Sequence, residues 1–499
     1  MSKRYILAID AGTSGIRTIL YDYTSREIAS TFSTFTQITP SPGLLEHDPM
    51  EIWNVTSHLI KETIKKATIS PNEISAIGVT GQRSTVLAWD KQTGLPVHHA
   101  IVWQDVRTYE RCEELTELLG MNISPISAFT KYEWLLNHVL DCREKVQSGE
   151  VLIGTIDSWL IWKLTEGEAF VTDPSQAMTT NLWHPLTGDW SPELADLIGM
   201  PVEKLASIVP SSHVVGTTSK ETFGANIPIA AVAGDQQAAM FGHLCLQPGE
   251  GKATYGTSVM VNVNTGTEWI MDEKCHSLAL CQTGKEHQHQ FCLEGTVITG
   301  GASISWIKDL HILHSVDESI QLAESVTDSG GVIFIPALQG LGTPFMNPSV
   351  KGAFLGLTRA STRAHIARAV LEGVAFRTRQ VIEVLRDISP TTAFESLQVD
   401  GGMAVNDILL QIQADVLGIN VNRPASNQTT ALGVAYLAGL ATKFWSSVEE
   451  ITAAKIPDKT FYPSENAPKL QKKYEKWVSV VHSIRSLTES DDQKELFHP

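Results

Sequence analysis

Two mainly apolar stretches separated by a turn of small residues open the chain, and they constrain its fold more than any other feature. Residues 5–9 and 16–21 have the composition of strands, and the segment from Asp10 to Gly15 between them is rich in Gly, Thr and Ser. A similar pattern recurs at residues 251–261, where a Gly-Thr turn again separates two strand-like stretches. We therefore expect a β-hairpin at the start of each of two domains.

The length of the chain supports this division. A chain of 499 residues exceeds what one hydrophobic core usually supports, so two large domains are expected. Short apolar strands alternate with helical patterns throughout, which favours an α/β fold. Pro and Gly interrupt both patterns between Cys245 and Gly251, so we place the domains at residues 1–246 and 247–499.

The charge and the cysteines exclude several classes of partner. A net charge of −17 would repel phosphate backbones and anionic lipids, so we expect neither nucleic acid nor a membrane as a partner. The first apolar run stops at Asp10, too soon for a signal peptide, and no run of 18 apolar residues follows. The six cysteines form no Cys-x-x-Cys pair, which is typical of reduced thiols in a cytoplasmic protein.

Local signals also predict individual elements. Asp48 followed by Pro49 predicts a helix that begins at Pro49, because Asp is a preferred cap and Pro suits the first helical position. Residues 75–80 read as a strand, and residues 86–89 read as a strand that returns after a loop.

The opening turn has the chemistry of a phosphate site. Gly permits close approach of the backbone, and Thr and Ser add hydroxyl donors to the backbone N–H groups. Asp10 before the turn suits a hydrated Mg²⁺, which usually takes only one or two carboxylates. The chain contains no P-loop motif, and a purely structural turn remains the alternative at this point.

Asp235 is the strongest candidate for a catalytic base. It follows the apolar stretch 231–233 and precedes a helix-forming run, so it could either accept a proton or cap the helix. The double glycine at residues 400–402 leaves room for a flat base or a ribose, and residues 299–303 offer another small-residue surface.

The sequence resembles the FGGY carbohydrate kinases and, within them, the glycerol kinases, because many of their motifs occur here in the same order. The residues that carry the resemblance are Asp10 to Thr13, Glu46 to Trp53, Gln82-Arg83, Ile101 to Gln104, Gly154 to Lys163, Ala233 to Gln237, Thr254 to Thr257, Gly352 to Leu357 with His365, Ala369 to Glu372, Asp400 to Gly402, and Ala431 to Gly439. The resemblance implies two ribonuclease-H-like domains of the actin and sugar-kinase type with ATP in the cleft between them. It implies an ATP-dependent kinase that phosphorylates a primary hydroxyl of glycerol or of a closely related small polyol.

The resemblance also implies a role for each matching residue. Asp10 would position Mg²⁺, and Asp235 would be the general base. The nucleotide contacts would be Thr13, Ser14, Arg17, Gly256, Thr257, Gly301, Gly402 and Asn406. The polyol contacts would be Arg83, Trp103, Asp235 and Gln236.

Three positions in the polyol pocket depart from the glycerol kinase pattern. Ser84 replaces a Glu that accepts hydrogen bonds from glycerol, Ile126 replaces a Tyr, and Met260 replaces an aromatic residue. Because hydrogen bonds to charged groups contribute roughly 1.5 to 3 kcal/mol, such changes favour a shift in substrate. A four- or five-carbon polyol such as erythritol or xylitol, dihydroxyacetone, or a ketose such as xylulose therefore remains an alternative to glycerol.

Two further readings stay open beside the kinase. One is a nucleotide-driven conformational protein like actin or the heat-shock ATPases, and the other is a catalytically silent binding homologue. Assembly into a homodimer or a homotetramer is also left open by the sequence.

Overall fold

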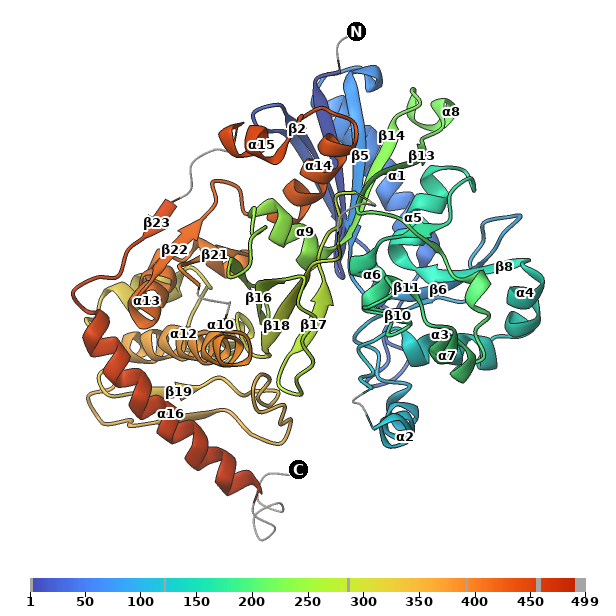
Figure 1. The fold of residues 1–499 in the computed structure, drawn as a ribbon. Coiled ribbons are helices and arrows are strands. Elements are labelled where there is room, and N and C mark those ends of the chain that lie inside the picture. Colours follow the sequence, from blue (N-terminus) through green and yellow to red (C-terminus); the bar gives the residue numbers. More distant parts are fainter. Residues whose placement is uncertain (1–2, 121–122, 285–287, 391–393, 455–458, 490–499) are drawn as a thin grey trace. The chain divides into compact units, whose positions relative to one another are not determined.

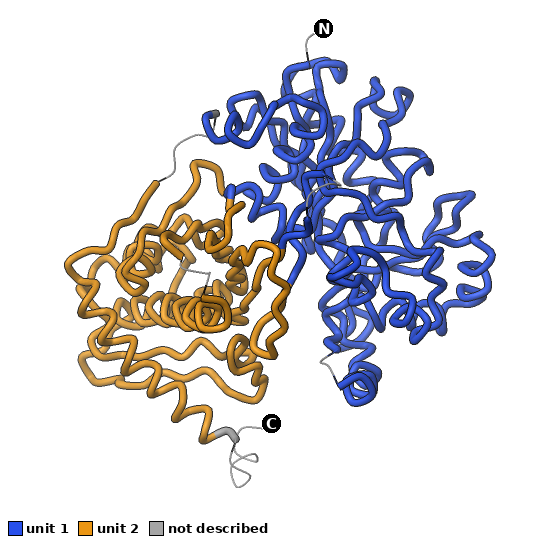
Figure 2. The backbone as a smooth tube through the Cα atoms, in the orientation of Figure 1, with its two compact units in different colours: residues 1–244, 278–290, 429–456 blue, residues 245–277, 291–428, 457–499 orange. Residues whose placement is uncertain are grey.

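The computed structural model describes residues 3–120, 123–284, 288–390, 394–454 and 459–489 (Figure 1). Contacts divide the chain into two units (Figure 2). Unit 1 comprises Met1–Leu244, Leu278–Gln290 and Thr429–Ile456, and unit 2 comprises Cys245–Ser277, Phe291–Gln428 and Pro457–Pro499. The first division lies close to the one we expected after residue 246. Two later segments, however, pack with unit 1, which no local sequence signal indicates.

Unit 1 contains a sheet of six strands in the order β13-β14-β5-β1-β2-β3. Strands β1, β2 and β3 are antiparallel neighbours, β5 runs parallel to β1, β14 runs parallel to β5, and β13 is antiparallel to β14. Their bounds are β1 Tyr5–Ala11, β2 Gly15–Asp22, β3 Glu27–Thr34, β5 Ile74–Gly81, β13 Ser212–Thr217 and β14 Pro228–Gly234. The register places Asp10 opposite Arg17 on one side and Thr80 on the other.

A second sheet of unit 1 has the order β4-β7-β6-β8. Its strands are β4 Glu46–His47, β6 Val86–Asp90, β7 Ala100–Ile101 and β8 Val151–Thr155. The expectation that residues 86–89 return alongside residues 75–80 is therefore wrong, because β6 pairs with β7 and β8. Both edges of β5 are already occupied, by β1 and β14, so the chain must leave the first sheet.

The helices of unit 1 cover these sheets. Helix α1 (Pro49–Lys66) begins where the sequence predicts, with the Asp48 side chain accepting from the Met50 amide. Helices α9 (Asp235–Gly242) and α14 (Thr429–Ala441) pack with their backbones in contact, since a Cβ at Gly433 would lie 1.8 Å from the carbonyl oxygen of Ala238. The other helices are α2 Tyr109–Leu119, α3 Phe129–His138, α4 Cys142–Ser148, α5 Ile156–Leu164, α6 Pro174–Met178, α7 Pro192–Leu197, α8 Lys220–Phe223 and α15 Val448–Ala454.

Unit 2 repeats the strand arrangement of unit 1. Strands β15, β16 and β18 are antiparallel neighbours, β21 runs parallel to β15, and β22 runs parallel to β21. The strand bounds are β15 Gly251–Tyr255, β16 Val259–Gly266, β18 Phe291–Val297, β21 Ser396–Asp400, β22 Asn420–Arg423 and the edge strand β23 Lys459–Phe461. Each unit thus opens with the predicted hairpin, and the expected α/β fold of two ribonuclease-H-like domains is confirmed.

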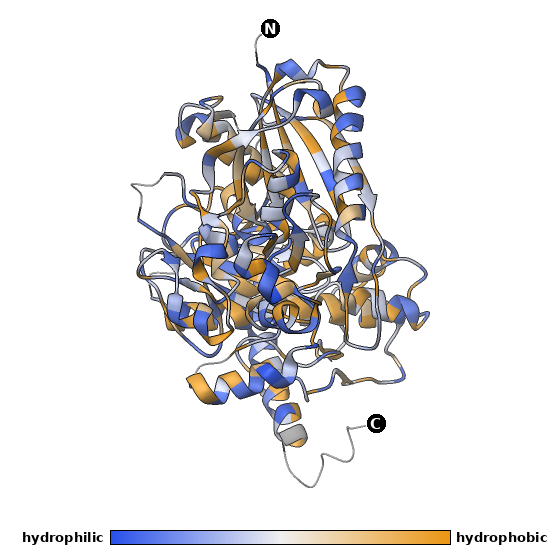
Figure 3. Cartoon of the chain, turned by 90° about the vertical axis from the view of Figure 1, so that its right-hand side faces the viewer, coloured by the Kyte–Doolittle hydropathy of each residue, from blue (hydrophilic) through white to orange (hydrophobic). Residues whose placement is uncertain are grey.

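Helices also flank the sheet of unit 2. They are α10 Ala302–Asp309, α11 Glu318–Glu324, α12 Arg363–Ile388, α13 Asp407–Leu417 and α16 Ala467–Glu489. Strand β17 (His276–Ala279) carries the chain from unit 2 to unit 1. Figure 3 shows mainly hydrophobic strands in the sheet near the N-terminus, whereas helices alternate hydrophobic and hydrophilic faces. Within the described ranges, no helix has both the length and the apolar character needed to cross a membrane.

Candidate functional site

The turn between β1 and β2 is fixed by close packing and by hydrogen bonds. A Cβ at Gly15 would lie 2.6 Å from the carbonyl oxygen of Ser33, so only glycine fits where β2 begins. The Gln37 amide donates to the Thr13 carbonyl oxygen (3.1 Å), and the Trp103 indole N–H donates to the Thr13 hydroxyl (2.9 Å). Ser14 beside it is exposed. The turn therefore presents a hydroxyl and backbone groups on a rigid support.

Two carboxylates lie at the strand ends of this region. Asp10 is near the end of β1, and Asp235 directly follows β14. Burial, and then the negative charge of Asp235, raise the pKa of Asp10 to about 7, while Arg17 acts in the opposite direction. A bound cation would relieve this repulsion between the carboxylates. The pair therefore fits Mg²⁺, which needs few protein carboxylates.

Within the described part of the chain, no larger group of metal ligands accompanies this pair. Among the residues that the structure describes, no group of three or more His, Cys, Asp or Glu side chains could hold a metal ion. Two carboxylates are enough for a hydrated Mg²⁺, which usually takes only one or two from a protein.

Asp235 is not the cap of α9. Gly234 occupies the cap position, and Asp235 is the first helical residue. Its carboxylate lies 3.3 Å from Arg83 Nε and accepts from the Gln236 amide (2.7 Å). About a third of the Asp235 side chain, 31%, remains exposed. Asp235 is thus held in one orientation yet is accessible to a ligand.

A buried network that sequence reasoning missed supports the strand end before Asp235. The Gly234 amide donates to the Ser175 hydroxyl (2.8 Å), which in turn donates to Asp173 (2.8 Å). Asp173 also accepts from the Ser211 hydroxyl and the Gln176 amide, and burial raises its pKa to about 7. The Asp173-Pro174 pair is a helix-start signal that could have identified Asp173 as a cap of α6, but not as a support for Asp235.

The Ser84 hydroxyl already donates its proton to another residue of the protein. Ser84 has a φ of 60° and is almost fully buried. Its hydroxyl donates to the Thr179 carbonyl oxygen at 3.0 Å. Because its proton is already committed, Ser84 can offer a ligand only its oxygen lone pairs.

Ile126 lies on a loop held by a buried lysine. Ile126 is 52% exposed, whereas Lys131 is fully buried. The Lys131 ammonium donates to the carbonyl oxygens of Trp103 (3.1 Å), Pro125 (2.6 Å), Ile126 (3.3 Å) and Ser127 (3.2 Å). Burial lowers the pKa of Lys131 to about 7. Lys131 thereby ties the loop that bears Ile126 to the backbone of Trp103.

Unit 2 holds the remaining predicted residues. A cavity of about 720 Å³ is lined by Gly256, Thr257, Gly301, Gly402 and Asn406, together with Tyr255, Trp306, Ile320, Leu338 and Met403 among others. All five nucleotide-contact positions expected in unit 2 therefore line one cavity. Met260 lies on β16 in the same unit, with the Thr296 hydroxyl 3.5 Å from its sulfur.

Glycines give this cavity its shape. A Cβ at Gly301 would lie 2.6 Å from the carbonyl oxygen of Gly256, and one at Gly401 would lie 2.6 Å from that of Tyr255. A Cβ at Gly402, in contrast, would meet no atom within 4 Å, so this residue faces open space. Asn406 caps α13 by accepting from the Leu409 amide (3.1 Å), which leaves its side-chain nitrogen to donate to a ligand.

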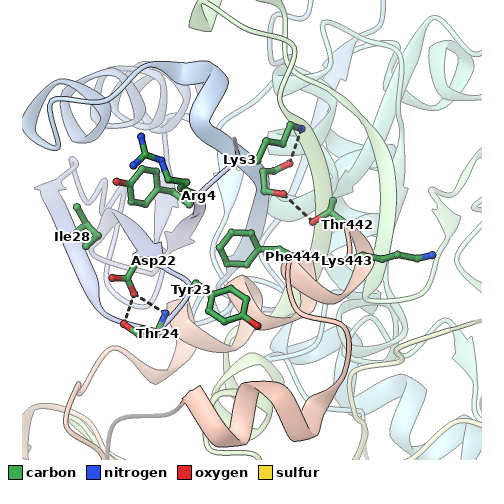
Figure 4. A pocket seen from close by; sticks show the side chains of 11 residues that line it. Lys3, Arg4, Asp22, Tyr23, Thr24, Ile28, Thr442, Lys443 and Phe444 are labelled. Carbon is green, nitrogen blue, oxygen red and sulfur yellow. Dashed lines mark hydrogen bonds between the residues drawn. The ribbon is translucent and has the colours of Figure 1, made fainter. Parts of the chain in front are cut away.

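A further hollow of about 670 Å³ lies at the start of β1, the end of that strand opposite to Asp10 (Figure 4). None of the predicted site residues lines it. Two of its cations already have partners, since Arg4 binds Glu73 (2.6 Å) and Lys3 donates to the Ser75 carbonyl oxygen (3.4 Å).

Comparison with known proteins covers nearly the whole chain. The family model for the N-terminal domain of the FGGY family of carbohydrate kinases matches residues 5–242, and the model for the C-terminal domain matches residues 251–442. Glycerol kinase 2 of Thermotoga maritima is 44% identical over 488 residues, which cover 96% of this chain and 98% of the relative. Glycerol kinase of Shewanella sp. strain ANA-3 is 41% identical over 497 residues, covering 97% and 100%.

Solved structures agree with these matches. Glycerol kinase of Plasmodium falciparum, crystallised with ADP, superposes with a TM-score of 0.90 at 29% identity, covering 97% of this chain and 98% of that one. Xylulose kinase of Lactobacillus acidophilus superposes with a TM-score of 0.83 at 21% identity, covering 97% and 99%, which is a likeness of fold alone.

Proposed function

This chain belongs to the FGGY family of carbohydrate kinases, which are ATP-dependent phosphotransferases, and we propose that it transfers the γ-phosphoryl group of ATP to a primary hydroxyl of glycerol. The observation that carries this proposal is the full-length similarity to glycerol kinases. The accessible Asp235 carboxylate beside Arg83 supports it. We also propose that the enzyme is cytoplasmic. A homodimer and a homotetramer are both open, and light scattering would distinguish them.

In the proposed reaction, Asp235 accepts the proton of the attacking hydroxyl while the hydroxyl oxygen bonds to the γ-phosphorus of ATP. The bond between that phosphorus and the ADP oxygen breaks, so the products are the phosphorylated polyol and ADP. Arg83, whose Nε lies 3.3 Å from the carboxylate, orients Asp235 for this transfer. We assign Thr13, Ser14 and Arg17 to the phosphates and Asp10 to Mg²⁺. Mg²⁺, when bound, supplies positive charge that offsets the charge of the phosphate oxygens.

We assign the nucleotide to the 720 Å³ cavity of unit 2, and Gly402 gives a direct test. Gly402→Leu is expected to raise the Kd for ADP at least about tenfold, because the new side chain enters open space that the ligand needs. The melting temperature should stay near the wild-type value, since the Cβ meets no atom within 4 Å.

Gly301→Ala provides the matched control. Its Cβ would lie 2.6 Å from a backbone oxygen, so this variant should lower the melting temperature. Calorimetric titration with ADP, together with thermal unfolding, measures both effects. Unchanged ADP affinity in the Leu variant would move the nucleotide to another surface.

A second substrate class is favoured by the placement of Ser84 and Ile126. The Ser84 proton is committed to Thr179, which leaves only a neutral oxygen as an acceptor, and the Ile126 side chain cannot donate or accept a hydrogen bond. A pocket with these residues holds the hydroxyls of glycerol less well than a pocket with Glu and Tyr. A four- or five-carbon polyol, dihydroxyacetone or xylulose is therefore the alternative acceptor.

Comparing kcat/KM for glycerol, erythritol, xylitol, dihydroxyacetone and xylulose separates the two proposals. Glycerol as the best acceptor by a wide margin would remove the alternative, and turnover of none would favour a catalytically silent homologue. The double variant Ser84→Glu, Ile126→Tyr should shift the kcat/KM ratio toward glycerol by about tenfold or more, since it restores a charged acceptor. The two single variants are the controls, and an unchanged ratio would contradict this account of the pocket.

A further inference from the structure

His47 belongs to the Glu46-His47-Asp48-Pro49 motif, but the reaction described above gives it no role. Asp48 caps α1, and Glu46 accepts from Arg107 (2.7 Å). His47 is fully buried, and its ring packs edge-on against Phe35 with centroids 4.8 Å apart. A buried histidine with two ring nitrogens needs partners for both.

One side of the His47 ring leads to the phosphate turn. His47 Nε2 lies 2.9 Å from Gln37 Oε1, and Gln37 Nε2 donates to the Thr13 carbonyl oxygen at 3.1 Å. Because the nitrogen of this amide is a donor to Thr13, its oxygen must accept from His47. Nε2 of His47 therefore carries the proton.

The other side leads to Trp103. Gln82 Nε2 lies 3.4 Å from His47 Nδ1, and the Thr85 hydroxyl donates to Gln82 Oε1 at 3.0 Å. The Trp103 backbone amide donates to the Thr85 hydroxyl oxygen at 3.2 Å. The Trp103 indole N–H then donates to the Thr13 hydroxyl at 2.9 Å, which closes a ring of hydrogen bonds.

Every donor in this ring of hydrogen bonds finds an acceptor only if the His47 imidazole is neutral. The Gln82 amide oxygen accepts from Thr85, so its nitrogen must donate, and Nδ1 of His47 must accept. Burial lowers the pKa of His47 to about 4, which keeps the imidazole neutral at physiological pH. Its hydrogen-bond partners Gln37 and Gln82 and its aromatic neighbour Phe35 carry no charge.

We propose that His47 is a positioning residue that holds the phosphate turn at Thr13 and the side chain of Trp103 in one fixed arrangement. Because Thr13 is assigned to the nucleotide and Trp103 to the polyol, this inference rests on the proposed function. We further infer that nucleotide binding at Thr13 favours polyol binding at Trp103, and the reverse, because both residues belong to the same ring of hydrogen bonds.

The two substitutions that test this proposal both remove the ring that packs against Phe35, and they differ in whether hydrogen-bonding groups remain. His47→Leu removes both ring nitrogens and leaves the Gln37 oxygen and the Gln82 nitrogen without their partner. His47→Gln keeps one donor and one acceptor, so it should rescue. His58→Gln is the matched control, because the His58 side chain is 75% exposed on the neighbouring helix α1.

The readout is the factor by which the best polyol of the substrate comparison changes the Kd for Mg·ADP, measured by calorimetry. We expect a factor above one in the wild type, in His47→Gln and in His58→Gln. In His47→Leu the factor should fall to about one, and kcat/KM should fall at least about tenfold. If His47→Leu does not fold, Gln37→Leu breaks the same ring at an exposed residue and should have the same effect.

A coupling factor in the leucine variant equal to that of the wild type would overturn the proposal, as would a wild type without coupling. If the wild type phosphorylates no polyol, the proposed function fails. The positioning role of His47 is then tested by Mg·ADP affinity alone. In that case His47→Leu should weaken Mg·ADP binding at least about fivefold relative to His47→Gln, and equal affinities would overturn the proposal.

Discussion

Replacing Asp235 by Asn is expected to lower kcat at least about a hundredfold while ATP and the polyol still bind. The amide has the shape of the carboxylate and can still accept from the Gln236 amide, so the start of α9 should be unchanged. It cannot take up the proton of the attacking hydroxyl, however. Steady-state kinetics and calorimetric titration with each substrate measure the two parts of this prediction.

Asp22→Asn is a suitable control for Asp235→Asn. Asp22 lies in the same unit, at the far end of β2, and its carboxylate accepts from the Thr24 and Arg26 amides. This variant should retain wild-type kcat. If Asp235→Asn also turns over at the wild-type rate, another group must be the base, and the proposed mechanism is wrong.

Asp10→Asn is expected to abolish most of the activity and yet stabilise the metal-free protein at pH 8. The loss of activity should exceed about a hundredfold, because a carboxylate that positions Mg²⁺ contributes several kcal/mol to the transition state through the metal. The gain in stability follows from the raised pKa of the buried carboxyl group.

The sign of the stability change depends on pH. The pKa of Asp10 rises from 3.8 to about 7 on folding, so the folded chain binds this proton more tightly than the unfolded chain. The contribution of Asp10 to stability is therefore fully present below pH 3.8 and is lost as pH rises through 7. At pH 8 the ionised Asp10 therefore costs the folded chain about 4 kcal/mol, a cost that the neutral Asn side chain avoids.

Thermal unfolding in a chelator at pH 5 and at pH 8 measures this effect. The melting temperature of Asp10→Asn minus that of the wild type should be larger at pH 8 than at pH 5. Mg²⁺ with ADP should reduce the difference at pH 8, because the cation stabilises the ionised wild-type carboxylate. A difference that does not change with pH would contradict the raised pKa.

The sequence by itself determined the elements whose causes are local. The two hairpins follow from turn residues between apolar strands, and the start of α1 follows from Asp48 and Pro49. The family could also be predicted, because its motifs are short segments in a fixed order. These features depend on neighbours within a few residues, so one chain is enough to recognise them.

The tertiary structure decided what depends on residues far apart in the chain. It placed β6 in a second sheet because the edges of β5 were already occupied, and it turned the Ser84 hydroxyl to Thr179. It also joined Thr13, His47 and Trp103 in one ring of hydrogen bonds and brought the charge of Asp235 to bear on Asp10. Burial and electrostatic repulsion arise only when the folded chain excludes water around such groups, and no local pattern of residues encodes that environment.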